Sequence, residues 1–146
     1  MDDSSRSLTE RGRLVQEHVA RELQHRGFSP DVILSSPRLR AEQTARITSG
    51  VLAGEVPFFE IKELKGGGSL EDFLLVLEAF MDCETITCVG HEPDMTFWTN
   101  RLLADNETQL NGYSNSMVVS LMFENQPAPG KARCNYRYTP DDLLFD

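Results

Sequence analysis

Two side chains in this sequence stand where phosphate chemistry is possible, Arg40 and His91. Arg40 lies near the start of an expected helix that follows an apolar stretch, beside backbone N–H groups that attract anions. Its planar guanidinium can hold two phosphate oxygens at once. His91 directly follows another apolar stretch and a glycine. Near neutral pH, an imidazole at such a place can donate to an anionic oxygen or transfer a proton.

The residue types alone leave simpler interpretations open for both. Arg40 could form a surface salt bridge with an acid such as Glu42, and His91 could be a hydrogen-bonded structural histidine. Other phosphate and metal sites fit less well. The glycine-rich loop 66–69 lacks the lysine of a Walker motif, and none of the three cysteines is followed six positions later by an arginine, as a cysteine phosphatase would need. No second histidine follows His91 at helical spacing, so we expect no metal.

The order of apolar runs and amphipathic segments predicts an α/β fold. Helices are expected over about 9–26, 36–50, 69–81 and 94–103, with Thr9, Ser36 and Ser69 as the N-caps of the first three. Strands are expected near 32–34, 56–61, 85–89, 116–123 and 133–138, the last antiparallel to the one before it. Strands that alternate with helices favour a layered sandwich. Ligands in such sheets lie at the carboxyl ends of the strands, and Arg40 and His91 both follow such ends.

Composition restricts the class of protein further. A chain of 146 residues with 40% hydrophobic and 25% charged residues is typical of one globular domain. The formal net charge of −9 argues against a nucleic-acid partner, since binding to that backbone needs clustered cations. We find no apolar run of membrane-spanning length and no secretory pattern in the acidic start at 1–5, so no membrane partner and a cytoplasmic location are expected.

Three segments, taken in order, resemble the histidine phosphatase superfamily, and within it the small SixA-type phosphohistidine phosphatases. They are 6–12 (RSLTERG), 35–44 (SSPRLRAEQT) and 89–95 (VGHEPDM). The second is the most specific, and 63–68 also resembles the short loop of this subgroup. The resemblance covers nearly the whole chain. It implies that 1–146 is a single phosphoglycerate mutase-like domain, a three-layer α/β/α sandwich with a mostly parallel sheet and an antiparallel edge.

The resemblance also implies a mechanism. In this family a histidine in an Arg-His-Gly motif, at the end of the first strand, attacks the phosphoryl group, and water then hydrolyses the phosphohistidine intermediate. By resemblance, Arg40 would clamp the transferring oxygens, His91 would stabilise their charge and Ser36 would add a donor. Glu63 stands where larger relatives have a proton-donating acid. The expected partner is a phosphohistidine-bearing protein or a small phosphoester, with no cofactor, because arginine, imidazole and helix amides supply the positive field.

The sequence departs from the family at one point, because it contains no Arg-His-Gly motif. Its first residues correspond to the segment that follows this motif, so the resemblance implies an N-terminally truncated domain without the first central strand and without the nucleophile. Three explanations are open: a start codon assigned too late, a truncated product or pseudoenzyme that binds phosphorylated ligands without turnover, or a different nucleophile such as His91. Loss of a central strand would leave two unpaired strand edges.

Overall fold

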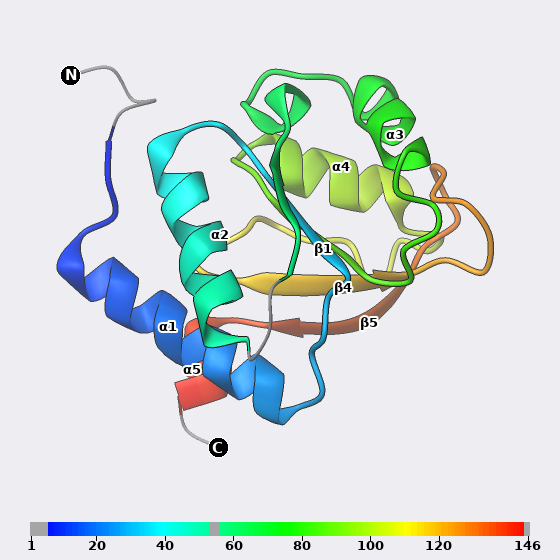
Figure 1. Cartoon of the computed structure of the whole chain (residues 1–146). Coiled ribbons are helices and arrows are strands. Elements are labelled where there is room, and N and C mark those ends of the chain that lie inside the picture. Colours follow the sequence, from blue (N-terminus) through cyan, green and yellow to red (C-terminus); the bar gives the residue numbers. More distant parts are fainter. Residues whose placement is uncertain (1–5, 53–55, 145–146) are drawn as a thin grey trace.

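A computed structural model describes residues 6–52 and 56–144 of the chain (Figure 1). The helices are α1 (Glu10–His25), α2 (Leu39–Val51), α3 (Leu70–Glu78), α4 (Asp94–Leu102) and α5 (Pro140–Leu144), with a 3-10 turn η2 (Lys62–Leu64). The strands are β1 (Val32–Ser35), β2 (Phe58–Glu60), β3 (Ile86–Val89), β4 (Val118–Met122) and β5 (Arg133–Tyr138). The α/β class predicted from the sequence is therefore confirmed.

The apolar run 32–34 forms the middle of a parallel sheet. β1 pairs with β2 on one side and with β3 on the other, and all four of its residues are buried. This is the pattern expected of a strand covered on both faces. β4 and β5 pair antiparallel in a separate two-stranded sheet, with an irregularity between Ser120 and Leu121.

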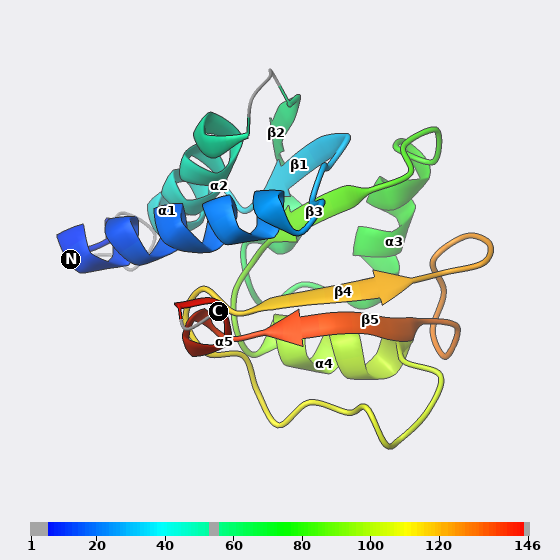
Figure 2. The ribbon, with the colours of Figure 1, turned by 90° about the horizontal axis from the view of Figure 1, so that it is seen from below.

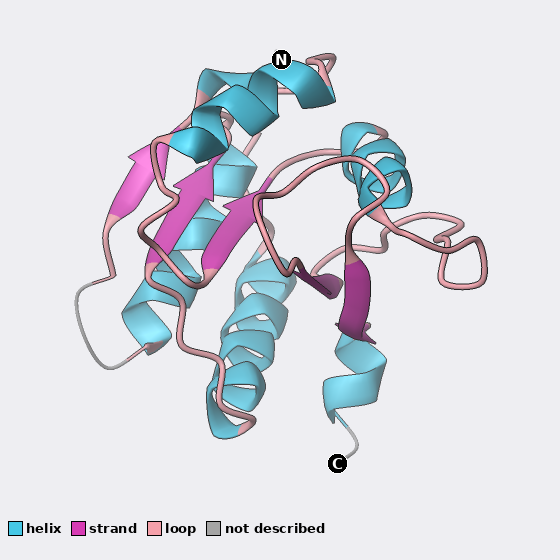
Figure 3. Cartoon of the chain, turned by 90° about the vertical axis from the view of Figure 1, so that its right-hand side faces the viewer, coloured by secondary structure: helices cyan, strands magenta, loops and turns pink. Residues whose placement is uncertain are grey.

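The two sheets are separated between β3 and β4. In Figures 2 and 3, β3 is the strand of the parallel sheet nearest to the β4–β5 pair. Among the described residues, β3 pairs only with β1, and β4 pairs only with β5. All four residues of β3 are only half-buried, in contrast with those of β1. Two of the edge strands of the described chain, β3 and β4, therefore lie on either side of this separation.

Two apolar clusters hold helices against opposite faces of the strands. One cluster joins β1 to α3, α4 and η2 and contains Val32, Leu34, Leu64, Leu70, Phe73, Leu77 and Trp98. The other joins α1 to α5, with half-buried side chains of β4 and β5 packed on it, and its buried members are Val19, Leu23 and Leu143. These clusters produce the helix–strand–helix layering predicted from the sequence.

Local hydrogen bonds explain where the helices begin. The Thr9 hydroxyl accepts from the N–H of Gly12 at 3.0 Å, the expected cap of α1. The prediction that Ser36 caps α2 is wrong, because the first helical residue is Leu39. The N–H of Ser36 donates to the Val89 carbonyl at 2.9 Å, which prolongs the pairing of β1 with β3 beyond Ser35 and delays the helix.

Candidate functional site

The ends of β1 and β3 bring Ser36 and His91 together. The two strands are parallel neighbours, so their carboxyl ends lie at the same edge of the sheet. Ser36 follows β1, and His91 follows β3 after Gly90. The Oγ atom of Ser36 lies 2.7 Å from Nε2 of His91, although the residues are 55 positions apart in the sequence. Two of the three segments singled out in the sequence therefore meet in one side-chain contact.

Arg40 belongs to the first turn of α2, at this same edge, and its side chain is half-buried. The helix runs away from this edge, so its N-terminal N–H groups face the carboxyl end of β1 (Figure 1). This is the placement that the sequence predicted for an anion site at a helix start. The role of Arg40 in holding phosphate stays a prediction.

The glycine loop 66–68 borders the site through Arg38. A Cβ on Gly66, whose φ is +112°, would lie 3.5 Å from Nη2 of Arg38, so the guanidinium packs on the loop. A Cβ on Gly68 would come within 2.9 Å of the carbonyl oxygen of Glu63, a backbone atom that cannot move aside easily. Glycine is therefore required where the chain passes over η2. Glu63 itself is half-buried there, and its role as an acid stays a prediction.

Glu92 connects the turn after His91 to a distant loop, and the sequence analysis missed it. Its Oε1 accepts from the N–H of Thr96 at 2.8 Å, and its Oε2 accepts from the Thr96 hydroxyl at 2.6 Å and from the N–H of Tyr113 at 3.1 Å. The Glu-x-x-x-Thr spacing at a helix start could have indicated the first two bonds. Nothing in the sequence points to Tyr113.

The Glu92 carboxylate is expected to make stability depend on pH. Partial burial raises the pKa of Glu92. The hydrogen bonds from Thr96 and Tyr113 lower it by more, so the pKa lies below its ordinary value of 4.5. A carboxyl whose pKa is lower in the folded than in the unfolded protein stabilises the fold at any pH above its pKa in the unfolded state. This contribution is lost as the pH falls through its pKa in the folded state. The free energy of unfolding of wild type should exceed that of Glu92→Gln at pH 7, and the gap should narrow below about pH 4.5.

Urea unfolding of both proteins between pH 3 and 7 measures this gap. Glu78→Gln, at an exposed position on α3, is the matched control, and its difference from wild type should vary less with pH. A gap for Glu92→Gln that stays constant over the range would contradict the prediction.

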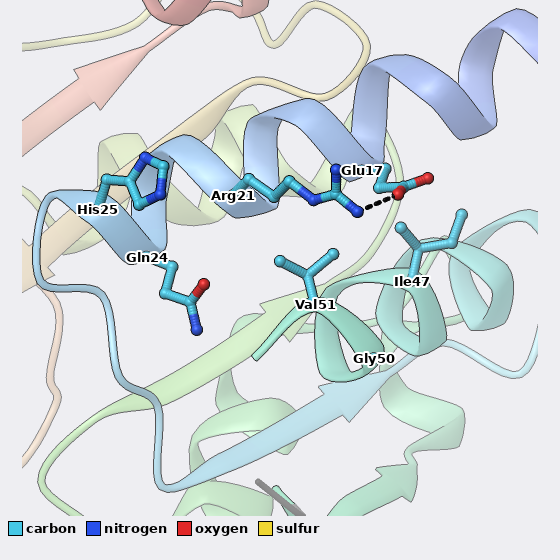
Figure 4. Close-up of a pocket in the computed structure, with 7 residues that line it drawn as sticks. All are labelled: Glu17, Arg21, Gln24, His25, Ile47, Gly50 and Val51. Atoms are coloured by element: carbon cyan, nitrogen blue, oxygen red, sulfur yellow. Dashed lines mark hydrogen bonds and ion pairs between the residues drawn. The ribbon is translucent and has the colours of Figure 1, made fainter. Parts of the chain in front are cut away.

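A separate pocket of about 500 Å³ lies between α1 and α2 (Figure 4). The two helices run in the same direction, since the N–H of Leu8 pairs with Gln43 and Gln16 pairs with Thr48. The pocket is near their C-terminal ends, away from the edge that carries Ser36 and His91. Its lining residues are Glu17, Arg21, Gln24, His25, Ile47, Gly50 and Val51. Because its arginine is paired with Glu17, we do not assign the phosphate site to it.

Cysteine, metal and membrane features complete the survey of the described residues. Burial raises the pKa of the Cys88 thiol to about 12, so it stays protonated near neutral pH and is a poor nucleophile. Within residues 6–52 and 56–144, no three His, Cys, Asp or Glu side chains are grouped to hold a metal ion. No helix in the same ranges is long and apolar enough to cross a membrane.

Comparisons with known proteins point to one family. Residues 2–66 match the histidine phosphatase superfamily (branch 1). An uncharacterized protein of Picosynechococcus sp. is 38% identical over 104 residues, which are 69% of this chain and 62% of that protein. The chain thus spans about three-fifths of that relative.

Two solved structures have the same fold. One is the protein histidine phosphatase SixA complexed with tungstate, with a TM-score of 0.85 and 24% identity, covering 97% of this chain and 89% of that one. The other is the putative phosphohistidine phosphatase SixA from Agrobacterium tumefaciens, with a TM-score of 0.79 and 22% identity, covering 96% and 87%. At these identities the likeness establishes the fold.

Proposed function

We propose that the chain forms the phosphate-binding part of a phosphohistidine phosphatase, because residues 2–66 match the histidine phosphatase superfamily and the chain has the fold of the SixA structures. The observation that carries the proposal is the 2.7 Å contact between Ser36 and His91, which joins two of the family-like segments at the carboxyl edge of the sheet. Arg40 holds the phosphoryl oxygens, and His91 stabilises the charge that develops on them. The substrate is phosphohistidine in a protein, with a small phosphoester as the other substrate class.

The nucleophilic histidine belongs, in this proposal, to a further strand between β3 and β4. The carbonyls of Thr85 and Val89 accept hydrogen bonds from the N–H groups of Asp31 and Ser36, on the β1 side. Backbone groups alternate along a strand, so those of Ile86 and Cys88 point toward the opening between the sheets. An added strand could pair with them and cover the half-buried side chains of β3 and β4.

The direction of such a strand is set by the edge of the sheet at which its histidine would have to lie. The N–H of Leu8 donates to Oε1 of Gln43 at 2.7 Å, so residues 6–9 lie beside the N-terminal half of α2, toward the edge that carries the site. A strand that runs parallel to β3 would have its carboxyl end at this edge, near His91. A histidine at that end could attack the phosphorus and release the substrate imidazole, which takes up a proton. Water would then hydrolyse the new N–P bond.

A second candidate is a non-catalytic module that binds phosphorylated ligands. The observation that favours it is the absence of an Arg-His-Gly motif from the 146 residues. Such a module would bind phosphate through Arg40 and His91 and would not turn it over.

One assay separates the two candidates. The assay compares the phosphatase activity of two proteins on a phosphohistidine-bearing protein. One is residues 1–146, and the other is extended upstream by an in-frame strand that ends in Arg-His-Gly. We expect phosphate binding by both and hydrolysis by the extended protein. An extended protein that is inactive with Arg40 and His91 intact would contradict the enzyme. Turnover by 1–146 would contradict the assignment of the nucleophile.

A further inference from the structure

We propose that Ser36 is a positioning residue, whose buried hydroxyl donates a hydrogen bond to Nε2 of His91 and so fixes the neutral ring with its proton on Nδ1. The family resemblance implies instead that Ser36 adds a donor to the phosphate. The consequence for phosphate rests on the proposed function, whereas the tautomer is a property of the folded chain and can be measured without any ligand.

Three hydrogen bonds hold the Ser36 hydroxyl in place. The residue is 0% exposed, and its N–H donates to the carbonyl of Val89 at 2.9 Å. Its own carbonyl accepts from the hydroxyl of Ser35 at 2.9 Å. Its Oγ accepts from the N–H of Arg38 at 3.1 Å. The backbone and the side-chain oxygen of Ser36 are thus anchored at the end of β1, so the oxygen is a rigid partner for the imidazole.

Of the two groups described as bonded to Oγ of Ser36, Nε2 of His91 is the one that can take the hydroxyl proton. A backbone N–H can only donate, so the bond from Arg38 uses a lone pair of Oγ and leaves the hydroxyl proton in place. Buried hydroxyl groups donate that proton to an acceptor. Nε2 of His91, at 2.7 Å, is an acceptor when it carries no proton. The neutral imidazole then carries its proton on Nδ1, since the bond at one ring nitrogen determines the state of the other.

This tautomer suits a phosphate pocket. A protonated Nδ1 can donate to an anionic phosphoryl oxygen, whereas an unprotonated nitrogen would present a lone pair and repel it. Ser36 would therefore act on phosphate through His91. This explains how a fully buried hydroxyl can affect an anion that binds from solvent.

Ring ¹⁵N NMR of the anion-free protein near pH 8, where imidazole is neutral, tests the tautomer. His91→Gln identifies the signal of His91 among the three histidines. We expect Nδ1–H in wild type and a shift toward Nε2–H in Ser36→Ala. Thr48→Ala is the matched control, because it removes a buried hydroxyl whose bonds are to Gln16 and Thr44, and it should leave the tautomer unchanged.

Calorimetric titration with inorganic phosphate tests the consequence. Ser36→Ala should weaken binding by about 5-fold, the size of one lost hydrogen bond, and Thr48→Ala should not. The proposal is overturned by Nε2–H in wild type, a reading that does not depend on the folding of Ser36→Ala. It is also overturned by equal tautomer shifts in both variants, or by unchanged phosphate affinity in Ser36→Ala. A wild-type ring with Nδ1–H but no phosphate affinity would contradict the proposed function and support the tautomer.

Discussion

Arg40→Ala is expected to weaken the binding of inorganic phosphate or vanadate by roughly 100-fold and to leave the fold nearly unchanged. A guanidinium holds an oxyanion through two charge-assisted hydrogen bonds, each contributing about 1.5 kcal/mol, and about 3 kcal/mol corresponds to this factor. Arg40 is half-buried in the first turn of α2, outside both apolar clusters, so its truncation opens no cavity in the core.

Isothermal titration of the 146-residue chain measures this change, with thermal unfolding as the check on the fold. Arg46→Ala is the matched control. It removes the same charge from the same helix, at a side chain that is 64% exposed and pairs with Glu42. The control should retain nearly wild-type affinity. Unchanged affinity in Arg40→Ala, or an equal loss in both variants, would remove Arg40 from the site.

Trp98→Ala is expected to lower the free energy of unfolding by about 3–5 kcal/mol. Trp98 is 6% exposed and belongs to the cluster that joins β1 to α3 and α4. Its ring stacks on Phe73 at a centroid distance of 5.2 Å and lies 3.9 Å from the position of a Cβ on Gly68. Truncation of the Trp98 side chain leaves a cavity beneath the glycine loop 66–68, which borders the site. Because small domains are stable by only about 5–15 kcal/mol, the loss is a large fraction of the total.

Urea unfolding at neutral pH measures the effect of Trp98→Ala. The neighbouring residue provides the control, because Phe97 lies on the same helix with 62% of its surface exposed. Phe97→Ala should cost less than about 1 kcal/mol, since surface substitutions remove little packing. Comparable losses at the two positions would contradict the assignment of Trp98 to the core.

Elements with strong local signals were predicted well. β5 has the expected bounds at Arg133–Tyr138, and Thr9 and Ser69 cap their helices as their positions indicated. A cap is a contact across three residues, and a strand run is a property of consecutive side chains. Both are encoded within a short stretch of sequence, so neither needs knowledge of the rest of the fold.

Predictions failed where a distant partner competes with a local preference. Ser36 has the residue type of an N-cap, but its N–H pairs with Val89 on β3, and α2 begins three residues later. Glu92 was overlooked because one of its donors, the N–H of Tyr113, lies 21 residues away. Such contacts depend on how strands and loops pair in space, which local propensity does not specify.

The sequence by itself determined the residue types at the site, the alternation of strands and helices, and the likeness to histidine phosphatases. It also predicted that Arg40 and His91 follow strand ends. Because parallel strands place their carboxyl ends at one edge of a sheet, both residues were expected at the same edge. Only the tertiary structure decided that Ser36 faces His91 at 2.7 Å and that the sheet is divided between β3 and β4. The physical reason is that side-chain contacts and strand edges arise from pairing between segments tens of residues apart, where burial and backbone hydrogen bonds override the preference of each segment alone.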